Sequence, residues 1–149
     1  MPDAARLVAA LCLGLVGFFL SGVVMEMYTR TVADVNYGWF VYINVVLGVL
    51  VGWSWVGKRA GRGVSAAVTN GITGVAVVVF WGLLIHGGVE MIERAMKNRY
   101  DNAFEALTAV FEIGAEWGVL LFTAPILIVA GLGAFVVGIL TEYAWRTWR

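Results

Sequence analysis

The chain has 149 residues, of which 61% are apolar and only 13% are charged, and its ten basic and ten acidic side chains cancel. A soluble domain carries about 25% charged residues, so this composition excludes an ordinary soluble enzyme and a disordered chain. The zero formal charge and the single Cys and His also exclude a basic nucleic-acid binder, a disulfide framework and a Cys/His zinc site. The remaining class is an integral membrane protein.

Four apolar segments are long enough to cross a bilayer, which takes about 20 helical residues. We expect spans at about 7–26, 38–57, 64–90 and 124–145, and the middle of each is free of Lys, Arg, Asp and Glu. The first segment could instead be a signal peptide, but no small-x-small cleavage site follows its apolar core. We therefore interpret it as a retained helix, and residues 1–149 as a single all-α transmembrane domain built as a four-helix bundle.

The segment between the third and fourth spans has the periodicity of an amphipathic helix. Apolar residues recur every three or four positions from Val89 to Gly114, and charges fill the other positions. Asn102, with Glu105 three residues later, predicts an N-cap. We expect an extension of the third helix, a break near 98–102, and an additional amphipathic helix at about 102–122 on the outer, periplasmic face. Because this helix is acidic, we expect it to contact protein rather than anionic lipid headgroups.

Pro125 decides where the fourth span begins. Thr123-Ala124-Pro125 fits an N-cap followed by proline in the first turn, where proline loses no hydrogen bond. The fourth span would then start at about residue 124. The alternative is one longer helix that is kinked at Pro125.

The basic residues predict the orientation of the bundle. An even number of spans places both termini on one face, and the positive-inside rule assigns the face with more Lys and Arg to the cytoplasm. We therefore expect both termini in the cytoplasm. The cytoplasmic set is Arg6, Lys58, Arg59, Arg62, Arg146 and Arg149, and the outer set is Arg30, Arg94, Lys97 and Arg99.

Several segments in order along the chain resemble a known family. They include Gly57-Lys58-Arg59-Ala60-Gly61-Arg62-Gly63, Asn70-Gly71-Ile72-Thr73-Gly74, Arg99-Tyr100-Asp101 and Glu142-Tyr143-Ala144. Over nearly the whole chain, this pattern resembles the TrgA-type tellurite-resistance family of small bacterial inner-membrane proteins. The resemblance implies a multi-pass protein of the bacterial inner membrane that is linked to tellurium resistance, and it implies no catalytic or binding residue.

Few polar residues are candidates for a site. Lys58, Arg59 and Arg62 alternate with glycines whose amides could turn toward an anion, so this loop could contact lipid headgroups or a specific anion. It lacks the spacing of a P-loop. Asn44 and Asn70 lie in or at the edge of spans, where we expect interhelical hydrogen bonds that fix packing, with a ligand contact as the alternative.

Small and sulfur-containing residues are interpreted as packing residues. Gly48 and Gly52 have the small-xxx-small spacing that lets helix backbones approach closely, and Gly74 is assigned to the same role. Cys12 lies in an apolar helix, where a thiolate is disfavoured. His86 without neighbouring ligands is a poor metal site, although pairing with Glu90 or Glu93 on the same helix is possible. We expect neither a metal nor a cofactor.

No nucleophile, metal cluster or acid/base pair stands out, so we expect a protein that is not an enzyme. The predicted function is that of a helper or accessory subunit of another membrane protein complex. The expected partners are membrane lipids and other integral membrane subunits or a second copy of this chain, and not nucleic acid. The alternative is a transporter or channel for an oxyanion or small solute, although spans two and three offer no Lys or Arg to a hydrated dianion.

Overall fold

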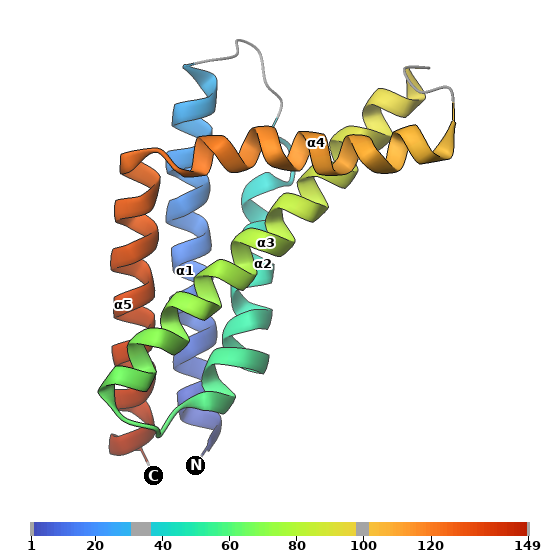
Figure 1. Cartoon of the computed structure of the whole chain (residues 1–149). Helices are drawn as coiled ribbons and strands as arrows, with labels where there is room; N and C mark the ends of the chain where they lie inside the picture. Colours follow the sequence, from blue (N-terminus) through green and yellow to red (C-terminus); the bar gives the residue numbers. More distant parts are fainter. Residues whose placement is uncertain (1, 31–36, 98–101, 149) are drawn as a thin grey trace.

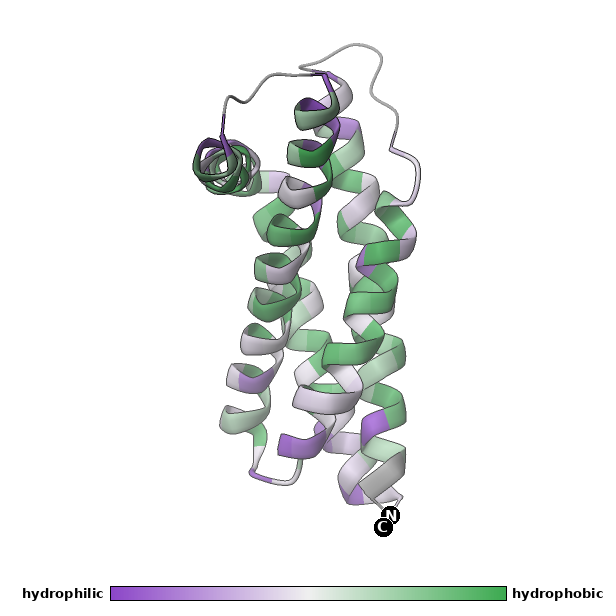
Figure 2. Ribbon diagram, turned by 90° about the vertical axis from the view of Figure 1, so that its right-hand side faces the viewer, coloured by the Kyte–Doolittle hydropathy of each residue, from purple (hydrophilic) through white to green (hydrophobic). Residues whose placement is uncertain are grey.

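The computed structural model describes residues 2–30, 37–97 and 102–148, and this part of the chain is all helical. Four of its helices are long and apolar enough to cross a membrane, which confirms the predicted fold class. Hydrophobic residues dominate these helices along their length (Figure 2). In chain order the α-helices are α1 (Pro2–Thr29), α2 (Phe40–Val51), α3 (Val64–Met96), α4 (Ala103–Leu121) and α5 (Ala124–Thr147).

The helix boundaries differ from the expected spans at several points. The expected span at 38–57 is α2 followed by a π-helical turn, Gly52–Val56, and a short 3-10 helix, Gly57–Arg59. A helix, α4, occupies most of the segment at 102–122, and its position at the membrane interface stays a prediction. The predicted break near 98–102 lies outside the described residues except for Asn102, and Arg99 and Arg149 also lie outside them.

The bundle is centred on α1, which packs along both α2 and α5, while α3 packs against α5 and α4. Leu13, Val56 and Val137 are completely buried between these helices. Both ends of the chain lie at the same end of the bundle (Figure 1). We call this the loop end, because the segment from Gly57 to Gly63 connects two helices there.

Glycines bring the helices into backbone contact near the loop end. A Cβ atom added to Gly48 would lie 2.4 Å from the carbonyl oxygen of Leu13, and one added to Gly138 would lie 2.2 Å from that of Ala67. The first pair joins α2 to α1, and the second joins α5 to α3. Because α3 and α5 touch here, their tilt separates them toward the other end of the bundle (Figure 1).

Helix α4 runs across the bundle rather than along it, and Figure 2 shows it nearly end-on beside the long helices. Asn102 is its N-cap and accepts a hydrogen bond from the Glu105 amide at 2.8 Å, as the sequence predicts. It buries only Ala109 and Ile113. The outer part of α3 and the first half of α4 project away from α5 (Figure 1), and we call residues 88–96 and 103–112 the arm.

The transition from α4 to α5 follows the proline pattern. Helix α4 ends at Leu121, Thr123 has extended backbone geometry as the N-cap, and Pro125 lies in the first turn of α5. Two separate helices meet here, rather than one helix kinked at Pro125.

Candidate functional site

The most distinctive feature of the bundle is a cavity of about 410 Å³ in the half farther from the loop end. All five α-helices contribute to its walls, which are almost entirely apolar. It lies where α3 has diverged from α5 and where the end of α4 crosses to the start of α5. Small molecules bind in cavities of about 300–1,000 Å³ with mostly apolar walls and a few placed polar groups, so its size and lining fit a small ligand.

Three polar side chains form a continuous hydrogen-bonded chain on the wall of this cavity. His86 Nε2 lies 3.1 Å from Asn44 Oδ1, Asn44 Nδ2 donates to Ser21 Oγ at 2.9 Å, and Ser21 Oγ donates to the carbonyl of Gly17 at 2.7 Å. The chain joins α3, α2 and α1. Asn44 thus makes interhelical hydrogen bonds, and it also lines a cavity, so both readings of this residue stay open.

The partner of His86 differs from the pairing considered in the sequence. Glu90 Oε1 forms an ion pair with Arg94, and Glu90 Oε2 accepts a hydrogen bond from Trp117 Nε1 at 3.2 Å. His86 is bonded to Asn44 instead. No group of three or more His, Cys, Asp or Glu that could hold a metal ion occurs among the described residues.

Aromatic rings form the part of the cavity wall next to the polar chain. The Phe40 ring lies 4.3 Å from the His86 ring and 5.8 Å from the Trp117 ring, centroid to centroid. On its other side, Trp117 stacks on Tyr28 at 4.6 Å. These contacts connect α4 to α1 and α2, and they connect α2 to α3.

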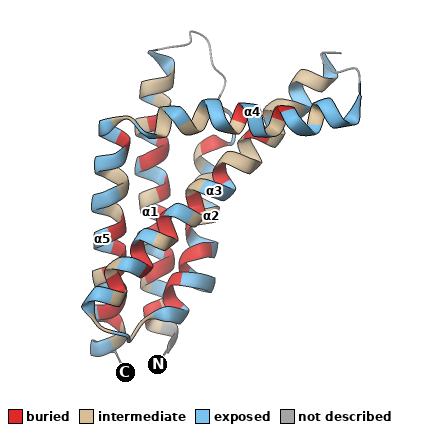
Figure 3. Cartoon of the chain, in the orientation of Figure 1, coloured by how far each residue is buried: buried red, intermediate tan, exposed pale blue. Residues whose placement is uncertain are grey.

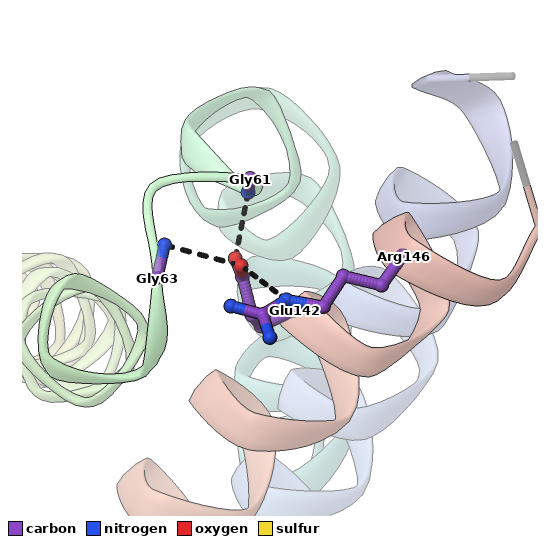
Figure 4. Close-up of polar contacts among 4 residues, drawn as sticks. All are labelled: Gly61, Gly63, Glu142 and Arg146. Atoms are coloured by element: carbon purple, nitrogen blue, oxygen red, sulfur yellow. Dashed lines mark hydrogen bonds and ion pairs between the residues drawn. The ribbon is translucent and has the colours of Figure 1, made fainter.

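The glycine-rich loop holds an anion, and that anion is the carboxylate of Glu142 in the same chain (Figure 4). The Gly61 amide donates to Glu142 Oε2 at 2.7 Å, and the Gly63 amide donates to Oε1 at 3.1 Å. Arg146 Nε, one turn along α5, donates to Oε1 at 3.1 Å. Only 5% of the Glu142 side chain is exposed, and this carboxylate was not singled out in the sequence.

Positive backbone angles make this arrangement possible. Gly61 and Gly63 have φ values of 90° and 97°, a region that residues with a Cβ atom rarely adopt. Their amides consequently point into the bundle. The cationic side chains of the loop, those of Lys58, Arg59 and Arg62, are exposed, and the Arg59 guanidinium lies 4.4 Å from the centre of the Trp55 ring. The structure therefore separates the loop amides from its cations.

Asn70 and Gly74 lie where α3 meets the π-helical turn. Asn70 is buried, and its Nδ2 donates to the carbonyl of Val56 at 2.8 Å. A Cβ atom at Gly74 would lie 2.5 Å from a methyl group of Val56. This hydrogen bond joins α3 to the last residue of the π-helical turn, which fits the interhelical packing expected of Asn70. Cys12 is half-buried beside the core.

Comparisons of the chain with protein-family models, with curated proteins and with solved structures give no match.

Proposed function

We propose that this chain is a non-enzymatic accessory subunit of another membrane protein complex, and that it docks through the arm. The supporting observation is that the arm exposes an apolar face that the bundle does not use. Exposed apolar side chains on both of its helices are Val89, Ile92, Met96, Phe104, Leu107 and Phe111. In Figure 3 the last part of α3, which belongs to the arm, carries exposed and intermediate residues.

The arm consists of two helical segments, and Glu90 connects it to the bundle by accepting a hydrogen bond from Trp117 Nε1. Helices α3 and α4 touch at the base of the arm, where a Cβ atom at Gly87 would lie 3.0 Å from the Val110 carbonyl oxygen. Residues 88–96 of α3 are all partly or fully exposed. The arm therefore presents a surface that the rest of the bundle leaves accessible.

Charge favours a protein partner over a lipid surface. Residues 103–121 include Glu105, Glu112 and Glu116 and no Lys or Arg. Helices that lie on anionic membranes are usually rich in Lys and Arg. An acidic helix is repelled by anionic headgroups, whereas it can meet a basic patch on a neighbouring subunit.

The proposal is tested by placing a photoreactive phenylalanine derivative at Phe104 or Phe111 in intact membranes, with Leu132 on α5 as the matched control. Leu132 is 64% exposed, as is Phe111. We expect one discrete protein adduct from the arm positions and none from Leu132. The variant Phe104→Ala/Phe111→Ala should reduce co-purification of that same protein. Lipid adducts alone, or identical adducts from all three positions, would refute the proposal.

The alternative, a transporter or channel for an oxyanion, is less well supported by the geometry. The cavity walls are apolar, and the loop amides already hold Glu142. An oxyanion would then have to be bound by the exposed side chains of Lys58, Arg59 and Arg62. Uptake into proteoliposomes that is lost when Lys58, Arg59 and Arg62 are made neutral would favour transport over the accessory role.

Location and orientation are further parts of this proposal. We place the chain in the bacterial inner membrane, with the loop end in the cytoplasm and the arm on the periplasmic side. Single cysteines at Lys58 and Glu112, in a Cys12→Ala background, should react with an impermeant thiol reagent from opposite sides. Labelling of both from the same side would overturn the orientation.

The link to tellurium resistance rests on the family resemblance. Cells that lack the chain should grow less well on tellurite, and the wild-type chain should restore growth. The Phe104→Ala/Phe111→Ala variant should fail to do so if the phenotype runs through the arm. Equal growth of all strains would remove tellurite from the proposal while leaving the docking role to be decided by the cross-linking result.

A further inference from the structure

We propose that the cavity is a binding site for a neutral, membrane-dissolved molecule that has a flat ring and at least one hydrogen-bond-accepting oxygen, and a quinone headgroup is a chemical example of this class. This inference rests on the cavity and its polar chain, and it is independent of the arm and of the accessory role.

The size of the cavity restricts what can occupy it. Small-molecule pockets in proteins have volumes of about 300–1,000 Å³. The cavity volume of about 410 Å³ lies near the lower end of that range. A ring system with a short tail fits this size.

The direction of the hydrogen bonds leaves a donor available at the wall. Because Asn44 Oδ1 can only accept, the imidazole must donate from Nε2, and its Nδ1 is then an acceptor. Asn44 Nδ2 carries two hydrogens, and Ser21 Oγ takes one of them. Within the described part of the chain, the second hydrogen has no protein acceptor. A ligand oxygen at the cavity wall can supply one.

The shape and polarity of the walls select the rest of the ligand. Phe40 and Trp117 line the cavity beside the polar chain, and a ligand ring can pack favourably against aromatic side chains, either stacked or edge-on. Phe80, Leu121 and Ile126 complete an apolar lining that would desolvate a charged group at high cost. The ligand is accordingly neutral, and it is apolar apart from the oxygen atoms that can accept a hydrogen bond.

The competing occupant is the acyl chain of a bilayer lipid, which also fills an apolar cavity. An acyl chain offers no acceptor to Asn44, so the two occupants differ in a single measurable property. A naphthoquinone with a short alkyl tail and the naphthalene with the same tail have similar size and apolar surface, but only the quinone carries carbonyl oxygens.

The test measures saturable quenching of Trp117 fluorescence by the naphthoquinone in nanodiscs, with Trp117→Phe identifying the signal of this residue. Binding of the naphthalene is measured by its displacement of the quinone. We expect the quinone to bind about three- to tenfold more tightly than the naphthalene, the ratio typical of one hydrogen bond. Asn44→Leu should abolish that ratio while the naphthalene still binds.

A second variant keeps the test decisive if Asn44→Leu does not fold. Ala130→Trp adds a large side chain to the α5 wall of the cavity and leaves the polar chain intact. It should remove saturable binding of both molecules, whereas Leu132→Trp, on the exposed face of α5, should not. Absence of saturable quenching in the wild type, equal affinity for the two molecules, or unchanged binding in Ala130→Trp would each overturn the proposal.

Discussion

The carboxylate of Glu142 makes a specific prediction about the glycine-rich loop. In Glu142→Gln, one side-chain oxygen remains for one loop amide, while the new NH2 group faces the other amide as a second donor. At least one charge-assisted hydrogen bond is lost at a side chain that is 5% exposed. Such bonds contribute about 1.5–3 kcal/mol. We expect the loop to open more easily by about 2–3 kcal/mol, which is about 30- to 150-fold faster amide exchange at the affected glycine.

Glycine-selective 15N labelling in micelles measures this directly, because the exchange of the Gly61 and Gly63 amides can be followed at single residues. Arg146→Ala is the matched control. Arg146 donates to Glu142 Oε1, the oxygen that also accepts from the Gly63 amide, but the Arg146 side chain is 54% exposed. An exposed pair of this spacing contributes about 0.3–0.5 kcal/mol, so its effect should be at most a few-fold. Wild-type exchange rates in Glu142→Gln, or a larger effect from Arg146→Ala, would show that the carboxylate does not hold the loop.

Two further substitutions test the packing between helices, both by SDS-induced unfolding in mixed micelles. Gly138→Ala places a Cβ atom 2.2 Å from the Ala67 oxygen and should cost about 1–3 kcal/mol, whereas Gly131→Ala, which meets nothing within 4 Å, should gain about 0.5–1 kcal/mol. Asn70→Ala removes the buried hydrogen bond from Asn70 Nδ2 to the Val56 carbonyl and should cost about 0.5–1.5 kcal/mol. Destabilisation by both glycine variants, or a neutral Asn70→Ala, would contradict these contacts.

The features that could be predicted from the sequence are those with local causes. Helices that cross a bilayer need a long apolar run, and that run can be read directly from the residues. The start of α4 follows from Asn102, whose side chain caps an amide within one turn, and the start of α5 follows from Pro125 in its first turn. Thr123 holds the N-cap position of α5, but its hydroxyl donates to the Leu120 carbonyl and does not cap the helix.

The candidate site depended on contacts between distant residues, and only part of it could be anticipated. Asn44 was identified because an amide in a span needs a partner, but the sequence does not say that the partners are Ser21 and His86. Ser21 gives no local signal, since a serine in a helix can bond to the carbonyl four residues earlier. The cavity is a consequence of helix tilt, which packing decides and periodicity does not.

In the glycine-rich loop, the amides have a partner within the chain, while the contact of Lys58, Arg59 and Arg62 with lipid headgroups or an external anion stays a prediction. Alternating glycines and cations indicated amides that could bind an anion, and two of those amides do bind one. The anion comes from a residue about 80 positions away in the sequence, so only the tertiary structure identifies it. A carboxylate near the end of an apolar span requires compensating partners, and Glu142, one helical turn before Arg146, carried that signal.

The glycines near the loop end also account for the cavity at the other end of the bundle. Two rigid helices that touch at one point and cross at an angle must separate with distance from that point. Helices α3 and α5 meet where Gly71 and Gly138 allow backbone contact, and the Glu142 carboxylate ties the start of α3 to the end of α5 through the loop amides. With this end closed, the far ends diverge, and the last turns of α4 cross the gap without filling it. A larger residue at Gly138 should therefore change the cavity, although Gly138 lies about two helical turns beyond Ala130, the last residue of α5 that lines it. Binding of the naphthoquinone probe would weaken together with stability. Weakened stability with unchanged binding would instead show that the cavity is held by α4 alone.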